Sequence, residues 1–317
     1  MAFGRKLDGV AMLITTHALH VTQPFPFTPS SWELVSNSTF GSSNVNAITK
    51  GLNRFVAVGN AGRLATSENV TSWTARTSSF GTSSVYSVAF GQNIFIAGGS
   101  TGKLATSSDG INWTQRNSSF GSSVILTITY SESANIWVAA GGSGKLATST
   151  NGISWTQRTS SFGTSFIRSI YNIGSTFVAV GDDGKLATST DGISWTQRTS
   201  SFSITSIYDV SSNANGTFFV AVGDTGKIAY SSNATSWTQN LPLFAFGSTS
   251  IRAIDGSTEE LGPFLAAGAN GKVASSFDGE AWAGRNSQFG SSTINDVFFD
   301  SSLAIIVGNA GKIAYGF

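Results

Sequence analysis

GKLATSTNGISWTQRTSSF (residues 144–162) and GKLATSTDGISWTQRTSSF (residues 184–202) differ only at Asn151 and Asp191. Weaker copies of this unit run through the rest of the chain. The tryptophans of the unit recur at steps of 41, 40, 42, 40, 42 and 45 residues, at Trp32, Trp73, Trp113, Trp155, Trp195, Trp237 and Trp282. A period of about 40–45 residues is typical of the blades of a β-propeller. The repeat therefore predicts a propeller of seven blades.

Two further markers recur with the tryptophans. Glycine followed by lysine or arginine occurs at Gly62-Arg63, Gly102-Lys103, Gly144-Lys145, Gly184-Lys185, Gly226-Lys227, Gly271-Lys272 and Gly311-Lys312. A phenylalanine in a Ser/Thr-rich loop occurs at Phe40, Phe80, Phe120, Phe162, Phe202, Phe246 and Phe289. We interpret the seven cations as surface charge that aids solubility and protects strand edges. A docking face for an acidic partner is the alternative.

Each unit contains four short segments rich in β-branched and aromatic residues. In the second unit these segments are 85–90, 93–97, 102–107 and 112–116, and Gly, Asn, Asp or Ser separates them. This pattern predicts four-stranded antiparallel blades in an all-β protein. The glycines between the second and third segments suit a tight hairpin that needs a positive φ.

The order of the markers at the two ends predicts how the ring closes. No Gly-Lys strand precedes Trp32, and no Trp strand follows residues 311–317. We therefore expect the last blade to take three strands from about 293–317 and its fourth from 31–35. This 3+1 closure leaves no open sheet edge in the ring. The predicted domains are an N-terminal extended arm at 1–30 and the propeller at 31–317.

Composition limits the classes of partner. The net charge is +1, which gives no electrostatic reason to expect nucleic acid as a partner. The chain has no cysteine, so disulfides and Cys-based metal sites are excluded. No apolar run approaches the roughly 18 residues that span a bilayer, and 9–19 resembles a signal peptide only loosely. We expect neither a cofactor nor membrane insertion.

A short Asx-containing segment precedes six of the tryptophans. Its Asp or Asn residues are Asn69, Asp109, Asn151, Asp191, Asn233 and Asp278. This segment resembles the Asp-box of BNR-repeat propellers, which occur in sialidases, secreted binding proteins and phage virion proteins. Here the Asx residue lies four rather than five residues before the tryptophan. A short Asx side chain can accept bonds from the N–H groups of its own turn, so we interpret these residues as structural.

The inventory of side chains argues against an enzyme. The resemblance to sialidases implies a triad of arginines, but only Arg168 and Arg252 fall on first strands. Both histidines, His17 and His20, precede the propeller. Asp209 and Asp296 occupy the same position in their blades and could line the channel as a glycoside-hydrolase pair. We interpret them as solvated channel lining and predict no catalytic or metal-binding residue.

The first strands suggest one binding surface. The sixth residue after each loop phenylalanine varies, and these residues are Asn46, Tyr86, Leu126, Arg168, Tyr208, Arg252 and Asn295. We expect them to ring one mouth of the channel, where polar, aromatic and cationic groups could bind a sugar or a peptide end. A tolerant, solvent-facing position is the alternative interpretation.

Two other segments could contact partners. An insertion in the repeat contains Leu241, Leu243 and Phe244, and deviations from a repeat often mark an interaction face. The arm contains Met12, Leu13 and Ile14, which have no core of their own, and three prolines that favour an extended chain. The arm could dock on its own propeller or on a neighbouring subunit.

These observations and the resemblance to phage proteins lead to one hypothesis. The chain is a non-enzymatic phage virion protein, a propeller displayed on head, tail or fibre and attached to other virion proteins through residues 1–30. It could contact a host surface glycan. The first alternative is an extracellular propeller lectin with repeated sites between blades. The second is a sialidase-type glycoside hydrolase.

Overall fold

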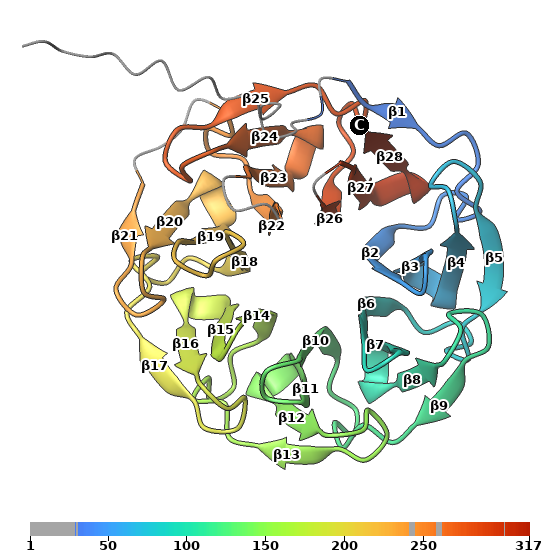
Figure 1. Cartoon of the computed structure of the whole chain (residues 1–317), viewed down its shortest axis with the longest axis horizontal. Helices are drawn as coiled ribbons and strands as arrows, with labels where there is room; N and C mark the ends of the chain where they lie inside the picture. Colours follow the sequence, from blue (N-terminus) through green and yellow to red (C-terminus); the bar gives the residue numbers. More distant parts are fainter. Residues whose placement is uncertain (1–28, 30, 241–244, 258–261, 301) are drawn as a thin grey trace, which may run out of the picture.

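Seven four-stranded antiparallel sheets surround a central channel in the computed structural model (Figure 1). The structure describes residues 29, 31–240, 245–257, 262–300 and 302–317. Within these ranges the structure contains strands and 3₁₀ turns but no α-helix, and therefore no helix long and apolar enough to cross a membrane. The innermost strand of each blade lines the channel, and the outermost strand faces solvent (Figure 1). The predicted seven-bladed, all-β propeller is confirmed.

Blades one to four follow the chain from the innermost strand to the outermost. Blade one contains β2 (Val45–Gly51), β3 (Arg54–Gly59), β4 (Arg63–Ser67) and β5 (Thr74–Thr77). Blade two contains β6 (Val85–Gly91), β7 (Ile94–Gly99), β8 (Leu104–Ser107) and β9 (Thr114–Arg116). Blade three contains β10 (Ile125–Ser131), β11 (Ile136–Gly141), β12 (Leu146–Ser149) and β13 (Thr156–Arg158). Blade four contains β14 (Ile167–Ile173), β15 (Thr176–Gly181), β16 (Leu186–Ser189) and β17 (Thr196–Arg198).

Blades five and six repeat this order, and blade seven is completed by the first strand of the chain. Blade five contains β18 (Ile207–Ser212), β19 (Phe219–Gly223), β20 (Ile228–Ser231) and β21 (Thr238–Gln239). Blade six contains β22 (Ile251–Gly256), β23 (Phe264–Gly268), β24 (Val273–Ser276) and β25 (Ala283–Arg285). Blade seven contains β26 (Ile294–Phe299), β27 (Ala304–Gly308), β28 (Ile313–Gly316) and β1 (Glu33–Leu34).

A 3₁₀ turn joins the second and third strands of every blade. These turns are η1 (Asn60–Gly62), η2 (Ser100–Gly102), η3 (Gly142–Gly144), η4 (Asp182–Gly184), η5 (Asp224–Gly226), η6 (Ala269–Gly271) and η7 (Asn309–Gly311). In η2, Thr101 and Gly102 have φ values of 54° and 64°, in the left-handed region. The expected positive-φ hairpin is therefore present.

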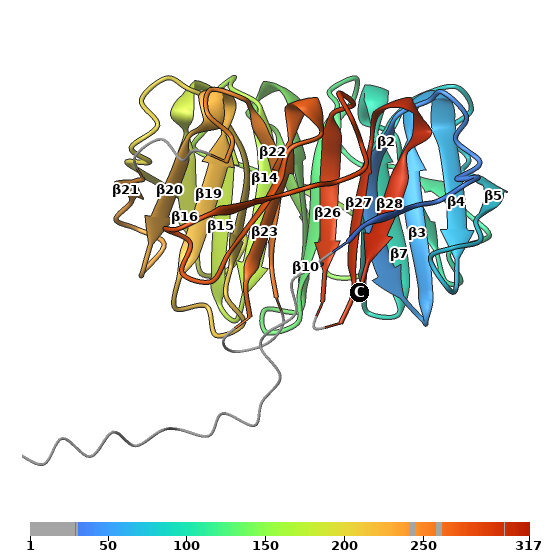
Figure 2. The same ribbon diagram turned by 90° about the horizontal axis from the view of Figure 1, so that it is seen from above.

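The ring closes where β1 pairs with β28, which places the two ends of the propeller side by side (Figures 1 and 2). Glu33 lies opposite Tyr315, and the Tyr315 hydroxyl donates to Glu33 Oε2 at 2.6 Å. The N–H of Val35 donates to the carbonyl of Ile313 at 2.9 Å. The 3+1 closure predicted from Trp32 is confirmed. Because every sheet now has four strands, the ring has no unpaired gap at this junction.

The apolar core lies between blades rather than inside them. Each of the seven core clusters takes buried residues from two neighbouring sheets. The loop phenylalanines are at most 1% exposed and wedge into these interfaces. A blade alone would leave both of its faces exposed, so the blades stabilise one another, as in other repeat architectures.

The Ser-Ser-Phe-Gly loop of the repeat ties the outermost strand to the turn of the same blade. In blade one, the Ser78 hydroxyl donates to the carbonyl of Gly62 at 2.6 Å and accepts the N–H of Phe80 at 3.2 Å. The equivalent serine at the ring closure, Ser38, donates to the carbonyl of Gly311 at 2.5 Å. One serine therefore holds both the loop and the turn, which explains why the repeat retains it.

The cations after the turn glycines have a structural role that the surface-charge interpretation missed. Lys145 Nζ donates to the carbonyl of Phe120 at 2.8 Å, and Lys185 Nζ donates to the carbonyl of Phe162 at 2.7 Å. Lysines of blades two and five to seven make the equivalent bond, and Arg63 donates to Thr39 at 3.0 Å. Each lysine thus anchors the loop that enters its own blade.

The turn glycines provide a stability test, because neighbouring blades approach closely there. A Cβ on Gly144 (φ +61°) would lie 2.1 Å from the carbonyl oxygen of Gly163 in the next blade. A Cβ on Gly163, also at φ +61°, would meet only Lys185 Nζ at 3.8 Å. We predict that Gly163→Ala costs about 1–2 kcal/mol through its positive φ alone. Gly144→Ala should cost a further 1–3 kcal/mol, roughly, because it also forces the blades apart.

Equilibrium unfolding of the two variants in denaturant would measure this difference. Equal losses of stability in Gly144→Ala and Gly163→Ala would contradict the close packing of blades three and four.

Candidate functional site

The variable residues that begin the first strands come together at one mouth of the channel. All seven line a single cavity of about 200 Å³, together with residues that follow them in the same strands. The seven are Asn46, Tyr86, Leu126, Arg168, Tyr208, Arg252 and Asn295. We refer to this set as the mouth ring. The predicted arrangement around one concavity is therefore present.

A β-bulge explains why two consecutive residues face the channel. In an ideal strand, neighbouring side chains point to opposite faces. In every innermost strand the register with the second strand shifts at the mouth-ring residue, as at Arg168 between Ile167 and Ser169. Both Arg168 and Ser169 line the cavity, as do Tyr208 and Asp209. Bulges re-aim side chains in this way. The sequence analysis expected Asp209 and Asp296 of this second layer to line the channel, but it did not identify the bulge that turns them there.

Aromatic and guanidinium groups form one stack along the mouth ring. The Arg168 guanidinium lies 5.4 Å from the Phe166 ring and 5.8 Å from the Tyr208 ring. The Arg252 guanidinium also packs on Tyr208, at 4.3 Å from the centroid of the ring. These distances are within the range of cation–π attraction. Blades four, five and six thus contribute a continuous row of aromatic and guanidinium groups to the mouth.

The two arginines differ in their partners. Arg168 forms a bidentate ion pair with Asp182, with Nε–Oδ1 and Nη2–Oδ2 distances of 2.9 Å. Blade six has Ala269 where blade four has Asp182, at the first position of the turn. Among the described residues, no hydrogen bond or ion pair joins the Arg252 guanidinium to another side chain. Arg252 is exposed, so its donors face the mouth.

Asp224 of blade five interacts electrostatically with Arg252. A hydrogen bond from the Ser250 hydroxyl, a backbone bond from Thr225 and the positive charge of Arg252 lower the pKa of Asp224. Ser250 and Thr225 both donate to Oδ1 of Asp224, and no hydrogen bond or ion pair joins the carboxylate to the Arg252 guanidinium among the described residues. The Arg252 guanidinium remains available to a ligand.

The asparagines of the mouth ring are engaged in holding blades together. Asn46 Nδ2 donates to the carbonyl of Val85 in the next blade at 2.8 Å. Asn295 Nδ2 donates to the carbonyl of Val45 across the ring closure at 2.9 Å. These two asparagines are therefore polar because their side chains bond to the backbone of the next blade. Tyr86, Leu126 and the arginine–tyrosine stack remain as candidates for ligand contact.

A second layer of the channel contains three carboxyl groups that bridge blades. Asp209 Oδ2 accepts the N–H of Ile254, Asp255 Oδ2 accepts that of Phe299, and Asp296 Oδ2 accepts that of Ile48, each at 2.9 Å. These bonds cross the junctions between blades five and six, six and seven, and seven and one. Asp209 and Asp296 line the cavity, as expected. Asp255 was missed, because its position carries no marker in the repeat.

Burial dominates the ionisation of these carboxyls. Desolvation raises the pKa of Asp209 to about 6 and that of Asp296 to about 7, and backbone hydrogen bonds offset only part of the effect. Desolvation also raises the pKa of Asp255 well above its ordinary value, and the negative charges of Asp296 and Asp209 add to this shift. The three groups are therefore close enough to repel one another when ionised.

The hydrogen bonds of Asp209 and Asp296 support a structural role. The Oδ1 atom of each accepts the N–H of the following residue, and Oδ2 accepts an N–H of the next blade. Both oxygens of each carboxyl are thus occupied by backbone donors. Within the described part of the chain, no group of three or more His, Cys, Asp or Glu residues is placed to hold a metal ion.

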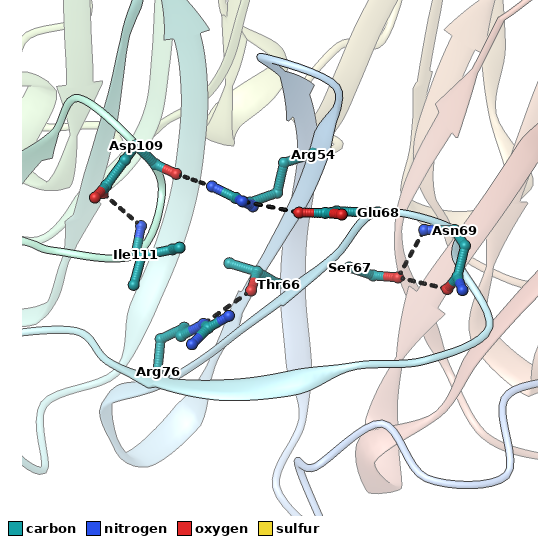
Figure 3. Close-up of polar contacts among 8 residues, drawn as sticks. All are labelled: Arg54, Thr66, Ser67, Glu68, Asn69, Arg76, Asp109 and Ile111. Atoms are coloured by element: carbon teal, nitrogen blue, oxygen red, sulfur yellow. Dashed lines mark hydrogen bonds and ion pairs between the residues drawn. The ribbon is translucent and has the colours of Figure 1, made fainter.

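The six Asx residues before the tryptophans form turns on the outer side of the ring. Asp109 Oδ1 accepts the N–H of Ile111 at 2.8 Å (Figure 3). It also accepts the N–H of Asn112 at 2.8 Å and the Ser107 hydroxyl at 2.9 Å. These bonds lower the pKa of Asp109 despite the opposing effect of burial. Equivalent bonds occur at Asn69, Asn151, Asp191, Asn233 and Asp278. The geometry matches the structural interpretation of these side chains.

The residues proposed for docking lie outside the described part of the chain. These are Met12, Leu13 and Ile14 in the arm and Leu241, Leu243 and Phe244 in the insertion. Their docking role stays a prediction.

Comparison with known proteins adds a family model and several solved structures. Residues 120–253 match the family model described as the DUF6242 beta propeller domain, so the chain is similar to that family over this range. No curated protein matches the chain.

The solved structures support the fold. A structure described as YCF48 bound to D1 peptide has a TM-score of 0.73 and 17% identity, covering 92% of this chain and 95% of that one. Virginiamycin B lyase from Staphylococcus aureus has a TM-score of 0.77 and 12% identity over 90% and 98%. The WD40 beta propeller domain of Doa1 has a TM-score of 0.69 and 12% identity over 90% and 95%. At these identities the likeness shows a shared fold.

The channel carboxyls predict an unusual dependence of stability on pH. Folding raises the pKa of Asp296 from 3.8 to about 7, so between these values the folded state keeps a proton that the unfolded state has lost. Stability therefore falls as pH rises through this window. We predict a higher melting temperature at pH 5 than at pH 7.5, and a smaller difference in Asp296→Asn.

Asp191→Asn is the matched control, because the pKa of Asp191 is lowered and its titration lies below this window. Differential scanning calorimetry at the two pH values would measure the effect. A protein that melts higher at pH 7.5 than at pH 5 would contradict the assignment.

Proposed function

We propose that this chain is a non-enzymatic binding protein that takes a carboxylate of a protein partner at the channel mouth. The free Arg252 guanidinium carries the proposal. It is exposed at the mouth, stacks on Tyr208 and has no acidic partner in its own blade. The favoured ligand is the C-terminal end of an extended peptide.

The chemistry of the mouth suits this ligand. A guanidinium presents paired donors that match the two oxygens of a carboxylate. Stacking on Tyr208 holds the Arg252 group in place, so little freedom is lost on binding. Asp209 and Asp296 lie deeper in the same cavity, and the raised pKa of Asp296, about 7, reduces the negative charge of that carboxyl near neutral pH.

One comparison supports a peptide as the partner. A propeller with the same fold has been solved in a complex described as bound to D1 peptide. Another neighbour is named as a lyase, so the fold itself does not decide between binding and catalysis. The non-enzymatic reading rests on the backbone bonds that occupy both oxygens of Asp209 and Asp296.

We further propose that the propeller belongs to a phage particle and is attached through residues 1–30. This placement rests on the resemblance of the Asx turns and near-identical blades to Asp-box propellers of virion proteins. An extracellular location is the alternative. Mass spectrometry of purified particles, with crosslinks from the arm to other virion proteins, would test the placement. Absence of the chain from the particles would refute it.

The binding proposal predicts that Arg252→Gln weakens capture of peptides with a free C-terminal carboxylate. Loss of a hydrogen-bonded charge pair costs about 1.5–3 kcal/mol, which is roughly a tenfold to 150-fold loss of affinity. The measurement is binding of the full chain to an immobilised library of random peptides, each present as the free acid and as the amide.

Arg285→Gln is the control, since Arg285 is an exposed arginine on the outermost strand β25. The proposal requires free-acid peptides to bind better than amides and Arg285→Gln to bind like the parent. Equal capture of acids and amides, or full binding by Arg252→Gln, would rule it out.

A further inference from the structure

Two pockets open at equivalent places on the outer side of the ring. One lies between blades one and two, has a volume of about 430 Å³, and is lined by Arg76, Ser79 and Trp113 among others. The second lies between blades three and four, has a volume of about 720 Å³, and is lined by Arg158, Ser161 and Trp195. Each pocket thus combines one arginine and one serine from one blade with the tryptophan of the next.

The arginine of each pocket is held in place but keeps free donors. Arg76 Nε donates to Thr66 Oγ1 at 3.0 Å, and Figure 3 shows its guanidinium extending over strand β4. Arg158 Nε donates to Thr148 Oγ1 at 2.9 Å. Neither guanidinium makes an ion pair with a described residue. Neither pocket lining contains an acidic residue. Each pocket therefore offers fixed, unpaired positive charge.

The tryptophan contributes ring surface rather than a hydrogen bond. Trp113 Nε1 donates to the carbonyl of Gly110 at 3.1 Å, so its polar atom is satisfied. Its ring packs on Phe95, at 6.5 Å between centroids, while part of the ring remains exposed in the pocket. Trp195 has the same arrangement with Phe177 at 6.2 Å. A partly exposed indole in a pocket is a stacking surface for another ring.

The serine of each pocket carries a hydroxyl that the fold leaves unused. Four hydroxyls are buried and have no hydrogen-bond partner among the described residues: Ser79, Ser119, Ser161 and Ser201. The residue before each one, such as Ser78, is fully bonded. A buried polar group without a partner costs about 1–3 kcal/mol. Retaining this arrangement in four successive blades points to a partner supplied from outside the chain.

We propose that these four junctions are equivalent binding sites for a sugar ring that carries a carboxylate. The indole would stack on the apolar face of the ring, the serine would bond to a hydroxyl, and the arginine would bind the carboxylate. The four sites pair the serines with Arg76, Arg116, Arg158 and Arg198 and with the tryptophans Trp113, Trp155, Trp195 and Trp237. The first three indoles are partly exposed, whereas Trp237 is buried, so the fourth site offers less ring surface. This inference is independent of the channel mouth.

The other three junctions lack part of this set. In blade five, Asn240 stands at the arginine position, and its side chain donates to the carbonyl of Glu280 at 2.7 Å. In blade six, the exposed Gln288 stands at the serine position. In blade seven, Val35 stands at the arginine position. The complete sites are therefore consecutive, on one arc of the ring. Weak sites side by side can bind a repeating polymer tightly through avidity.

The test measures the affinity of the full chain for D-glucuronic acid and for D-glucose by saturation-transfer NMR and calorimetry. We expect glucuronic acid to bind and glucose to bind at least about fivefold more weakly, which corresponds to about 1 kcal/mol. The variant with Ser→Ala at residues 79, 119, 161 and 201 should lose affinity by a similar factor. Its melting temperature should be at or above that of the parent, because the substitutions remove buried hydroxyls that make no bond in the fold.

A second variant, with Arg→Gln at residues 76, 116, 158 and 198, should lose the preference for the acid. Arg285→Gln should bind glucuronic acid like the parent, since Arg285 lies outside the four sites. No binding of glucuronic acid at tens of millimolar would overturn the proposal. So would unchanged affinity in the serine variant, or loss of sugar binding in Arg285→Gln.

Discussion

The β-bulge in each innermost strand is the feature on which the channel mouth depends. Without it, the side chains of Tyr208 and Asp209 would point to opposite faces of the sheet. With it, both line the same cavity, and the channel gains two layers of different chemistry. The upper layer is the mouth ring, which includes the exposed Arg252. The lower layer includes carboxyls that bond to the next blade. Because the bulge recurs in all seven blades, it leaves these positions free to vary while the frame stays constant.

The frame is held by bonds that run from blade to blade and from strand to turn. Phenylalanines wedge between sheets, lysines anchor the incoming loops, and Asp209, Asp255 and Asp296 join the last three junctions. These carboxyls concentrate next to the ring closure, where β1 contributes only two residues to its sheet. The same carboxyls also set the electrostatics beneath the mouth, so closure and candidate binding share residues.

The fold could be predicted from the sequence because each repeat unit corresponds to one blade. Seven tryptophans counted the blades, and the position of Trp32 identified the closing strand. The mouth ring could also be found, because its residues vary where their neighbours do not. The bulge could not be found, since it depends on register between strands rather than on residue type. Asp255 was missed because its position carries no marker in the repeat. The unbonded hydroxyls of Ser79 and its equivalents could not be found from sequence. Each is preceded by another serine, such as Ser78, whose hydroxyl is fully bonded, and residue type alone does not distinguish the two.

The central claim is that ligand recognition belongs to the variable mouth ring on blades four to six. Amide hydrogen exchange of the full chain, with and without a captured free-acid peptide, tests it most directly. We predict slower exchange on binding at the starts of β14, β18 and β22, around Arg168, Tyr208 and Arg252, with the outermost strands unchanged. Protection confined to the outermost strands, or absent from the starts of the innermost strands, would contradict the account.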